Sequence, residues 1–295
     1  MDFQLVKGVC KKDYNLKHFT WLKVGGSADV FFKPEDTDDL IVFLKENKNR
    51  VPVTVIGAGS NLIIRDKGIE GVVIKLGRSF TDIEFTGDGL ITVGGACLNF
   101  NLAKFCQVNS ITGFEFLVGI PGTVGGGVAM NAGSYGCEFK DIVDFVESVD
   151  NQGNLNTFSV DEIGFSYRSN SLPKDLIFTR VAFNIRNREN ATKIEQKMNE
   201  ITLMRNSSQP VVERTGGSTF ANPKSLKAWE LIEKSGMRGK KIGGVCMSEM
   251  HCNFMINYDN ATASDMENLG ELVKKTVKED SGIELEWEIK RIGRV

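Results

Sequence analysis

Two glycine-rich segments are the parts of this sequence whose composition points most directly to chemistry. The first, Gly57-Ala58-Gly59-Ser60-Asn61, directly follows an apolar run at residues 53–56. Glycine lacks a Cβ and adopts positive φ, so consecutive backbone N–H groups in such a loop can converge on a pyrophosphate. The third glycine of a dinucleotide-binding fingerprint is replaced by leucine, and the chain holds no phosphate-binding Gly-Lys-Ser/Thr motif. A turn that ends a strand therefore explains this segment about as well as a ligand site does.

The second segment, residues 119–127, has five glycines in nine residues. Each ordered glycine costs about 0.5–1 kcal/mol relative to alanine, so such a concentration calls for a compensating contact. Pro121 and Val124 are unlike the serine and glycine filler of flexible linkers. The pattern predicts extended loops between residues 113 and 136 whose backbone approaches a large ligand. Together the two segments indicate a dinucleotide cofactor that would itself supply the chemistry.

Charge and histidine content exclude several other functions. The chain has 36 Lys+Arg against 38 Asp+Glu, a formal charge of −2, and only two histidines. Without a broad positive field, nucleic acid is not expected as a partner. Two histidines are too few for an enzyme built on histidine bases or histidine ligands, and no metal site is expected.

Cysteine spacing and hydropathy indicate a cytoplasmic protein. The six cysteines contain no Cys-x-x-Cys pair, so we expect mostly reduced core thiols rather than a disulfide scaffold. The sequence has no apolar run that approaches the roughly 18 residues of a membrane span and no signal-peptide core near its start. Membranes are therefore not expected as partners.

Hydrophobic periodicity predicts mixed helix and strand along the chain. Asp36 and Thr37 can cap a helix whose apolar face carries Leu40, Ile41 and Leu44. Further helices are predicted over 98–106, 191–206, 226–234 and from a cap at 264 to a stop at 281–282; strands are predicted over 53–56, 72–76, 91–93, 142–149, 156–160, 176–185, 254–257 and 283–289. A break at Gln209-Pro210 would separate a larger first region from a smaller second one.

A series of motifs, in order along the chain, gives it a specific resemblance. The first three are residues 57–62 (Gly-Ala-Gly-Ser-Asn-Leu), 113–126 (Gly-Phe-Glu-Phe-Leu-Val-Gly-Ile-Pro-Gly-Thr-Val-Gly-Gly) and 130–133 (Met-Asn-Ala-Gly). The series continues with 166–168 (Ser-Tyr-Arg), 217–220 (Gly-Ser-Thr-Phe), 222–223 (Asn-Pro), 251 (His), 253–254 (Asn-Phe) and 288–293 (Glu-Ile-Lys-Arg-Ile-Gly). Over nearly its whole length the chain resembles the UDP-N-acetylenolpyruvoylglucosamine reductase family, in its shorter second type.

This resemblance implies an α+β fold with a vanillyl-alcohol-oxidase-like FAD-binding domain of two subdomains and a smaller α+β substrate-binding domain. The implied boundaries are 1–80 with 285–295, then 81–207, then 208–284. The implied activity is NADPH-dependent, FAD-mediated reduction of UDP-N-acetylglucosamine enolpyruvate to UDP-N-acetylmuramate, in peptidoglycan precursor synthesis. The expected partner is this small nucleotide sugar, and the expected state is a cytoplasmic monomer.

The resemblance also implies roles for individual residues. Arg168 would hold the enolate and its carboxylate, Ser218 would protonate carbon, and Glu288 would assist at the enolic intermediate. Tyr167, Arg205 and Asn222 would bind the substrate. FAD would be held by Gly57, Ala58, Gly59, Ser60, Asn61, Gly119, Ile120, Pro121, Gly122, Thr123, Gly125, Gly126, Asn131, Ala132 and Gly133. By residue type alone, the three catalytic candidates could equally be a surface arginine, a turn serine and a carboxylate on a solvated strand face.

Two other functions stay open at this point. One is an FAD oxidase of a small alcohol or sugar on the same scaffold; such enzymes often tether flavin through His or Cys, and neither histidine lies in a glycine-rich segment. The other is a non-catalytic nucleotide-binding module. The joint presence of Arg168, Ser218 and Glu288 argues against it.

Overall fold

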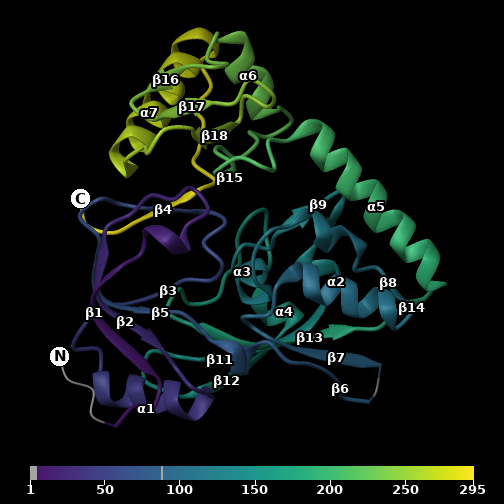
Figure 1. Ribbon diagram of the computed structural model, residues 1–295. Coiled ribbons are helices and arrows are strands. Elements are labelled where there is room, and N and C mark those ends of the chain that lie inside the picture. Colours follow the sequence, from purple (N-terminus) through teal and green to yellow (C-terminus); the bar gives the residue numbers. More distant parts are fainter. Residues whose placement is uncertain (1–4, 88) are drawn as a thin grey trace. The chain divides into compact units, whose positions relative to one another are not determined.

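A computed structural model describes residues 5–87 and 89–295 of the chain (Figure 1). The chain divides into two units. Unit 1 comprises the described residues up to Lys12, Val30–Ala58 and Gly71–Met204; unit 2 comprises Asp13–Asp29, Gly59–Glu70 and Arg205–Val295. The break at residue 205 lies close to the one expected at Gln209-Pro210. The three-part division implied by the resemblance stays a prediction.

The first sheet has the strand order β1-β2-β5-β3. Its strands are β1 (Val9–Asn15), β2 (Ser27–Lys33), β5 (Ile69–Ile74) and β3 (Val53–Val55). β3 and β5 are parallel, with Val53 opposite Val72. Helix α1 (Thr37–Asn47) begins where its cap predicts, because the Asp36 carboxylate accepts a hydrogen bond from the Asp39 N–H at 2.8 Å. The predicted helix and both strands of this region are confirmed.

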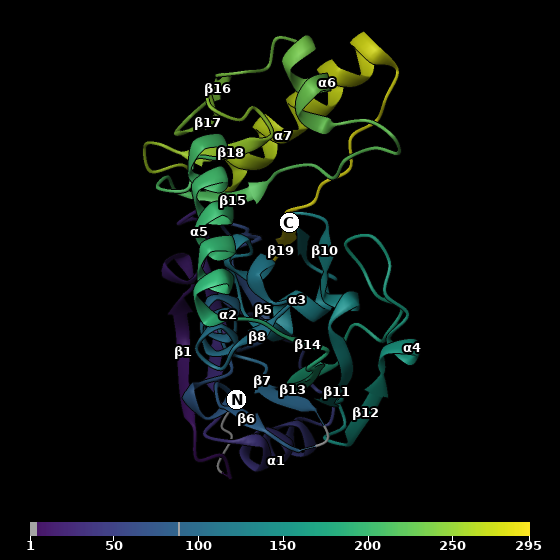
Figure 2. The same ribbon diagram turned by 90° about the vertical axis from the view of Figure 1, so that its right-hand side faces the viewer.

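The second sheet is antiparallel and belongs to unit 1, with the order β12-β11-β13-β7-β6. Its strands are β6 (Ile83–Phe85), β7 (Leu90–Gly94), β11 (Val143–Val149), β12 (Leu155–Ser159) and β13 (Ile177–Asn184). Helices α2 (Asn99–Val108) and α3 (Val124–Ala129) contribute Leu102 and Val128 to the same core as Val146 and Phe183. The short helix α4 (Val160–Ile163) lies beside β12 (Figure 2).

The glycine-rich segment 113–136 is more regular than predicted. Instead of extended loops, the chain forms a 3-10 helix at Glu115–Gly119 and helix α3. Thr123 starts α3 because its hydroxyl oxygen accepts the Gly126 N–H. Gly127 is needed inside the helix, since a Cβ there would lie 2.2 Å from the ring of Phe139. The expectation of extended loops was therefore wrong, because a cap and close packing outweigh the low helix propensity of glycine.

The remaining elements of unit 1 are short, apart from the predicted helix α5 (Ala191–Ser208), whose last turn contains the boundary with unit 2. The short strands are β8 (Ile111–Thr112), β9 (Gly133–Ser134), β10 (Cys137–Glu138) and β14 (Asn187–Arg188). β9 pairs with β10, and β8 pairs with β14. The other 3-10 helices of unit 1 are Arg78–Phe80 and Phe139–Asp141, and unit 2 contains a further one at Lys17–Phe19.

Unit 2 has an antiparallel sheet in the order β15-β18-β17-β16, with a long helix packed against it (Figure 1). The strands are β15 (Thr215–Ser218), β16 (Lys241–Ile242), β17 (Val245–Met247) and β18 (Phe254–Asn257), and the helices are α6 (Ala228–Lys234) and α7 (Ala263–Ser281). Helix α7 buries Met266, Leu269, Val273 and Val277, as its spacing predicts. Its cap is Thr262 rather than the predicted serine at position 264.

The C-terminal segment is only partly the strand that its alternation predicts. Residues 283–289 form a single bridge, Phe220 to Trp287, and the paired strand is β19 (Lys290–Ile292), parallel to β4 (Leu62–Ile64). Burial does alternate, since Leu285 and Ile289 are buried and their neighbours are more exposed. The expected strand was wrong over most of its length, because alternation reports burial and not the presence of a partner strand.

The cysteines are all free thiols. Cys97, Cys106 and Cys252 are buried, whereas Cys10 and Cys137 are exposed. No helix within residues 5–87 and 89–295 combines the length and apolarity needed to cross a membrane.

Candidate active site

The two glycine-rich segments meet in unit 1. A Cβ on Gly57 would lie 2.7 Å from the hydroxyl oxygen of Thr123, so only glycine allows the first segment to reach the start of α3. Ile56 N donates to Ile74 O at 3.0 Å, which ties the end of β3 to β5 and fixes where the first segment begins. The sequence analysis placed both segments in one cofactor site, and the structure brings these two residues together.

Backbone donors of the two segments are used unequally. The N–H groups of Val124 and Gly125 donate to Cys97 O at 2.8 Å and Gly95 O at 2.9 Å, and that of Gly126 donates to Thr123. In contrast, the partly exposed Gly57, Ala58 and Gly122 have N–H groups that donate to no acceptor among the described residues. These three donors are the ones left for an anionic ligand.

Lys75 adds a positive charge that the sequence analysis did not select. Its ammonium group donates to the carbonyl oxygen of Gly57. Burial, and secondarily the charge of Lys33, lowers the pKa of Lys75. The sequence feature that could have drawn attention to this residue is its position directly after the strand at residues 69–74. Unengaged N–H groups beside a cation fit the diphosphate of a dinucleotide such as FAD.

Tyr167 and Arg168 form the tip of a tight turn in unit 1. Ser166 N donates to Ser169 O at 2.9 Å, and Ser169 N donates back to Ser166 O at 3.2 Å. Arg168 has φ of 55°, a left-handed conformation that is uncommon for arginine. Its guanidinium lies over the Tyr167 ring, 5.2 Å from the centroid, and its Nη2 donates to Gly133 O at 3.4 Å. The predicted carboxylate clamp therefore contacts the predicted cofactor segment.

In unit 2, Ser218 and Glu288 lie on either side of one peptide. The Glu288 N–H donates to Thr219 O at 2.9 Å, and Thr219 N donates to Asn253 O at 2.7 Å. The Asn253 amide also bonds Phe220 at both its N–H and its carbonyl. Hydrogen bonds thus connect the chain segments that carry these two predicted catalytic residues.

A β-bulge in β15 directly precedes Ser218. Thr215 pairs with Ile256 and Ser218 pairs with Phe254, so β15 has one extra residue between these pairs, and Gly217 has φ of 79°. The bulge decides which residue of β15 pairs with Phe254. Ser218 is partly exposed, and its hydroxyl makes no hydrogen bond to another described residue. A free hydroxyl is what a proton donor to an external substrate requires.

Glu288 is held from a second side by the first glycine-rich segment. The Asn61 side-chain amide donates to Glu288 O at 3.1 Å, and Lys290 N donates to Asn61 O at 3.1 Å. The sequence analysis assigned Asn61 to the cofactor, which stays a prediction, and its side chain contacts the backbone of the predicted catalytic residue Glu288. This role rests on a contact far apart in sequence, so no local pattern could have revealed it.

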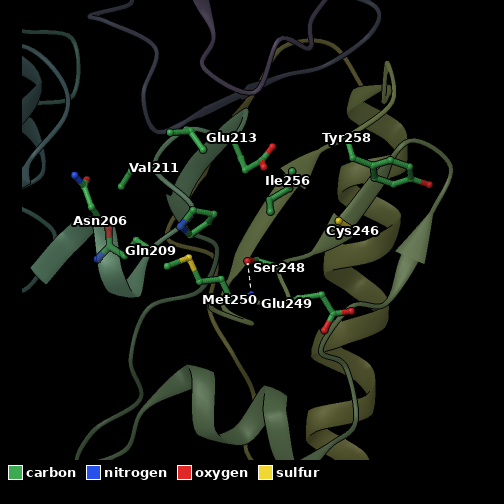
Figure 3. A pocket seen from close by; sticks show the side chains of 12 residues that line it. Asn206, Gln209, Val211, Glu213, Cys246, Ser248, Glu249, Met250, Ile256 and Tyr258 are labelled. Atoms are coloured by element: carbon green, nitrogen blue, oxygen red, sulfur yellow. Dashed lines mark hydrogen bonds between the residues drawn. The ribbon is translucent and has the colours of Figure 1, made fainter. Parts of the chain in front are cut away.

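A cavity of about 540 Å³ opens in unit 2 beside β17 and β18 (Figure 3). Its wall includes Cys246, Ile256 and Met250, together with Asn206 and Gln209 near the end of α5. Cross-strand partners share a sheet face. Because Cys246 pairs with Ile256 and Ser218 pairs with Phe254, two residues before Ile256, Ser218 lies on the face that carries this cavity.

Two of the predicted substrate residues in unit 2 have structural partners. The side-chain Oδ1 of Asn222 accepts the Ala228 N–H at 3.0 Å, at the start of α6. The Nδ2 of the same side chain bonds no described residue. Arg205 Nε donates to the Gln209 side chain at 3.4 Å, and Gln209 lines the cavity. These contacts orient both side chains.

His251 packs against an aromatic residue of unit 2. Its ring lies 4.7 Å from that of Phe254, centroid to centroid, and its Nδ1 accepts the Asn253 N–H at 3.4 Å. Burial lowers the pKa of His251. Among the described residues no group of three or more His, Cys, Asp or Glu side chains could hold a metal ion.

Comparisons with known proteins agree with this picture. The profile of the FAD binding domain matches residues 28–159, and that of the UDP-N-acetylenolpyruvoylglucosamine reductase C-terminal domain matches 209–292. The chain is 62% identical to UDP-N-acetylenolpyruvoylglucosamine reductase of Rickettsia bellii (strain RML369-C) over 295 residues, which cover 100% of this chain and 97% of the relative. It is 64% identical to the enzyme of the same name from Rickettsia rickettsii (strain Sheila Smith) over 290 residues, which cover 98% of each chain.

A solved structure extends the agreement to the fold. The crystal structure of UDP-N-acetylenolpyruvylglucosamine reductase from Thermus caldophilus matches with a TM-score of 0.83 at 30% identity, covering 97% of this chain and 99% of that one. The α+β fold with an FAD-binding domain is thereby confirmed. The chain belongs to the UDP-N-acetylenolpyruvoylglucosamine reductase family.

Proposed function

We propose that this chain is an FAD-containing, NADPH-dependent reductase that converts UDP-N-acetylglucosamine enolpyruvate to UDP-N-acetylmuramate, a step of peptidoglycan precursor synthesis. The observation that carries the proposal is the hydrogen bond from the Glu288 N–H to the carbonyl oxygen of Thr219, the residue that follows Ser218, in a chain of this family. Monomeric state and cytoplasmic location, expected from the sequence, belong to the same proposal.

Residues of both glycine-rich segments would hold FAD. The unengaged N–H groups of Gly57, Ala58 and Gly122 would donate to its diphosphate, with Lys75 close to the first segment. Gly125 and Gly126 would serve the cofactor by shaping α3, because their N–H groups already donate within the protein. FAD, when bound, would supply the redox chemistry by taking electrons from NADPH and passing them to the substrate.

The chain's own residues would handle charge and protons on the substrate. Adding two electrons and a proton at the β-carbon of an enolpyruvyl group leaves an enolate next to its carboxylate, and Arg168 offers a planar pair of donors for that anion. Ser218 would donate the proton that completes the reduction at the adjacent carbon. A serine hydroxyl is a weak acid, so its alkoxide must be stabilised or reprotonated at once. Glu288 would assist this step.

The cavity of unit 2 supports a nucleotide-sugar substrate. Its volume of about 540 Å³ lies within the usual range for small-molecule sites, and apolar walls with a few amides suit a base or a sugar ring. Arg205, hydrogen-bonded to the cavity residue Gln209, would meet the diphosphate.

An absorbance spectrum of the purified protein tests the proposal. We expect a bound flavin spectrum, bleaching by NADPH without oxygen, and recovery when the enolpyruvyl substrate is added. S218A should keep bleaching nearly intact and slow recovery by about 100-fold or more, while S235A, at a serine without a side-chain hydrogen bond at the end of α6, should behave as wild type. A colourless protein that takes up no FAD would contradict the proposal, and rapid oxygen consumption without NADPH would favour the oxidase alternative.

A further inference from the structure

The Asn131 side chain is fully buried, and every polar group on it is engaged. Its Nδ2 donates to Glu138 Oε2 at 2.9 Å and to Ser166 O at 3.0 Å, and its Oδ1 accepts the Lys140 N–H at 3.0 Å. A side-chain amide has two N–H donors. Both are spent inside the protein, so this side chain has no donor left for a cofactor, although the resemblance places the residue in the cofactor segment.

These bonds link two segments to which the sequence assigns different ligands. Asn131 lies in the expected FAD segment, and Ser166 precedes the Tyr167-Arg168 tip of the expected substrate turn. The turn is held at two points by the same segment, because Asn131 bonds Ser166 O and Gly133 O accepts from Arg168. The position of the guanidinium therefore depends on the position of residues 131–133.

A carboxylate completes the cluster and makes the identity of residue 131 specific. Glu138 accepts from Asn131 and forms a 2.8 Å ion pair with Lys140. Burial raises the pKa of Glu138, but bonds from Lys140 and Asn131, with the charges of Lys140 and Arg168, lower it overall. An aspartate at position 131 would offer Glu138 a second negative charge and no donor. Asparagine also tolerates the left-handed conformation found here, with φ of 41°.

We propose that Asn131 is a positioning residue for substrate recognition, holding the Ser166–Ser169 turn so that the Arg168 guanidinium can receive the carboxylate of the enolpyruvyl group. The inference rests on the proposed function and deepens it. Asn131 acts through Arg168 and touches neither substrate nor the reacting atoms. Its loss should therefore weaken the substrate half of the reaction and spare the reduction of the flavin.

The test compares N131D with N131G in the FAD-loaded protein. N131D keeps the size and backbone preference of the residue and removes its donors, whereas N131G keeps the left-handed conformation and removes the side chain. For both variants we expect KM for the enolpyruvyl substrate to rise about 10- to 100-fold, with flavin reduction by NADPH within about twofold of wild type. S134A is the matched control, because Ser134 bonds Phe116 O in the same segment and is not bonded to the turn; its KM should not change.

A double-mutant cycle with R168Q separates positioning from general structural damage. If Asn131 acts through Arg168, N131D should add little to the KM of R168Q. Additive effects, or equal losses in both half-reactions, would overturn the inference, and so would loss of FAD from both variants. If wild type itself is not bleached by NADPH or does not recover with substrate, the proposed function fails and the result does not depend on Asn131.

Discussion

Glu288 and Thr219 are joined by a 2.9 Å hydrogen bond from the glutamate N–H to the threonine carbonyl oxygen. Ser218 immediately precedes Thr219, so this one bond sets the spacing between the backbones of the two predicted catalytic residues in unit 2. The Thr219 N–H donates to Asn253 O at 2.7 Å, so both backbone groups of Thr219 are held. Backbone hydrogen bonds thus hold the two segments that carry these predicted catalytic residues next to each other, whatever rotamers their side chains adopt.

Replacing Glu288 by glutamine should slow recovery of the flavin colour by substrate about 100- to 10,000-fold, because an amide of the same shape cannot exchange a proton in the same way. Bleaching by NADPH should be unchanged. Stopped-flow absorbance measures both steps separately. E286Q is the matched control, since Glu286 is exposed and lies two residues away on the same segment. A comparable loss in E286Q would show that the segment as a whole, and not the carboxylate of Glu288, matters.

Replacing Gly57 by alanine should weaken FAD binding, because the new Cβ would lie 2.7 Å from the Thr123 hydroxyl and push the two glycine-rich segments apart. We expect at least a tenfold loss of FAD affinity, or about 1.4 kcal/mol, measured by titrating the apoprotein. G136A is the control: it also adds a Cβ, but that atom meets nothing within 4 Å, and only the positive φ of 83° is strained. It should cost folding stability and leave FAD affinity intact. Equal FAD losses in the two variants would argue against this packing role.

Replacing Asp66 by asparagine should destabilise unit 2 by about 1 kcal/mol at neutral pH. The Asp66 carboxylate accepts the N–H groups of Ala263 and Ser264 and the Ser264 hydroxyl at the start of α7. Burial raises the pKa of Asp66, but these hydrogen bonds lower it overall.

Because the pKa of Asp66 is lower in the folded state than its unfolded value of 3.8, the ionised carboxylate stabilises the folded protein at pH values above 3.8. This stabilisation is lost as the pH falls through the folded-state pKa. The free-energy gap between wild type and D66N, from urea unfolding, should therefore close at acid pH. D280N replaces an exposed carboxylate near the end of the same helix. Its free energy of unfolding should stay close to that of wild type at neutral pH. A gap that stays constant down to pH about 2 would contradict the assignment.

The pH dependence of stability near neutrality should come in part from His251. Because burial lowers its pKa in the folded state, the neutral form contributes stability that is complete above the unfolded value of 6.5 and is lost as the pH falls toward the folded value. Unfolding free energy should thus fall less steeply in H251Q than in wild type between about pH 7 and pH 5. An unchanged slope in H251Q would rule out this contribution.

Most of the regular elements could be predicted because their signals are local. Helix α1 follows from its Asp36 cap, and strand β18 lies at 254–257, where its apolar run predicts it. Helix α3 was missed because glycine is a poor helix former in isolation, and only the distant ring of Phe139 explains why Gly127 must be there. The C-terminal strand was misplaced because its partner, Leu62–Ile64, lies far away along the chain.

The sequence suggested the candidate site residues, whose roles stay predictions, but it did not show the hydrogen bonds between them. Motif order brought Arg168, Ser218 and Glu288 to attention. The contacts of the Asn61 and Asn131 side chains needed coordinates, because both bond residues remote in sequence. Lys75 was overlooked, and Asn253 was named only as part of a motif, because a lysine after a strand and an asparagine before one are common and gain meaning only from their partners.

The link between Asn61 and Glu288 joins residues 227 positions apart and has a consequence for biosynthesis. The chain is synthesised from its N-terminus, so strand β4 leaves the ribosome long before its parallel partner β19. Until then unit 2 already contains Ser218 but lacks Glu288, so a stalled nascent chain can carry the proposed proton donor without its carboxylate partner. Pairing of β4 with β19 and the arrival of Glu288 beside Asn61 therefore depend on the same late-synthesised segment.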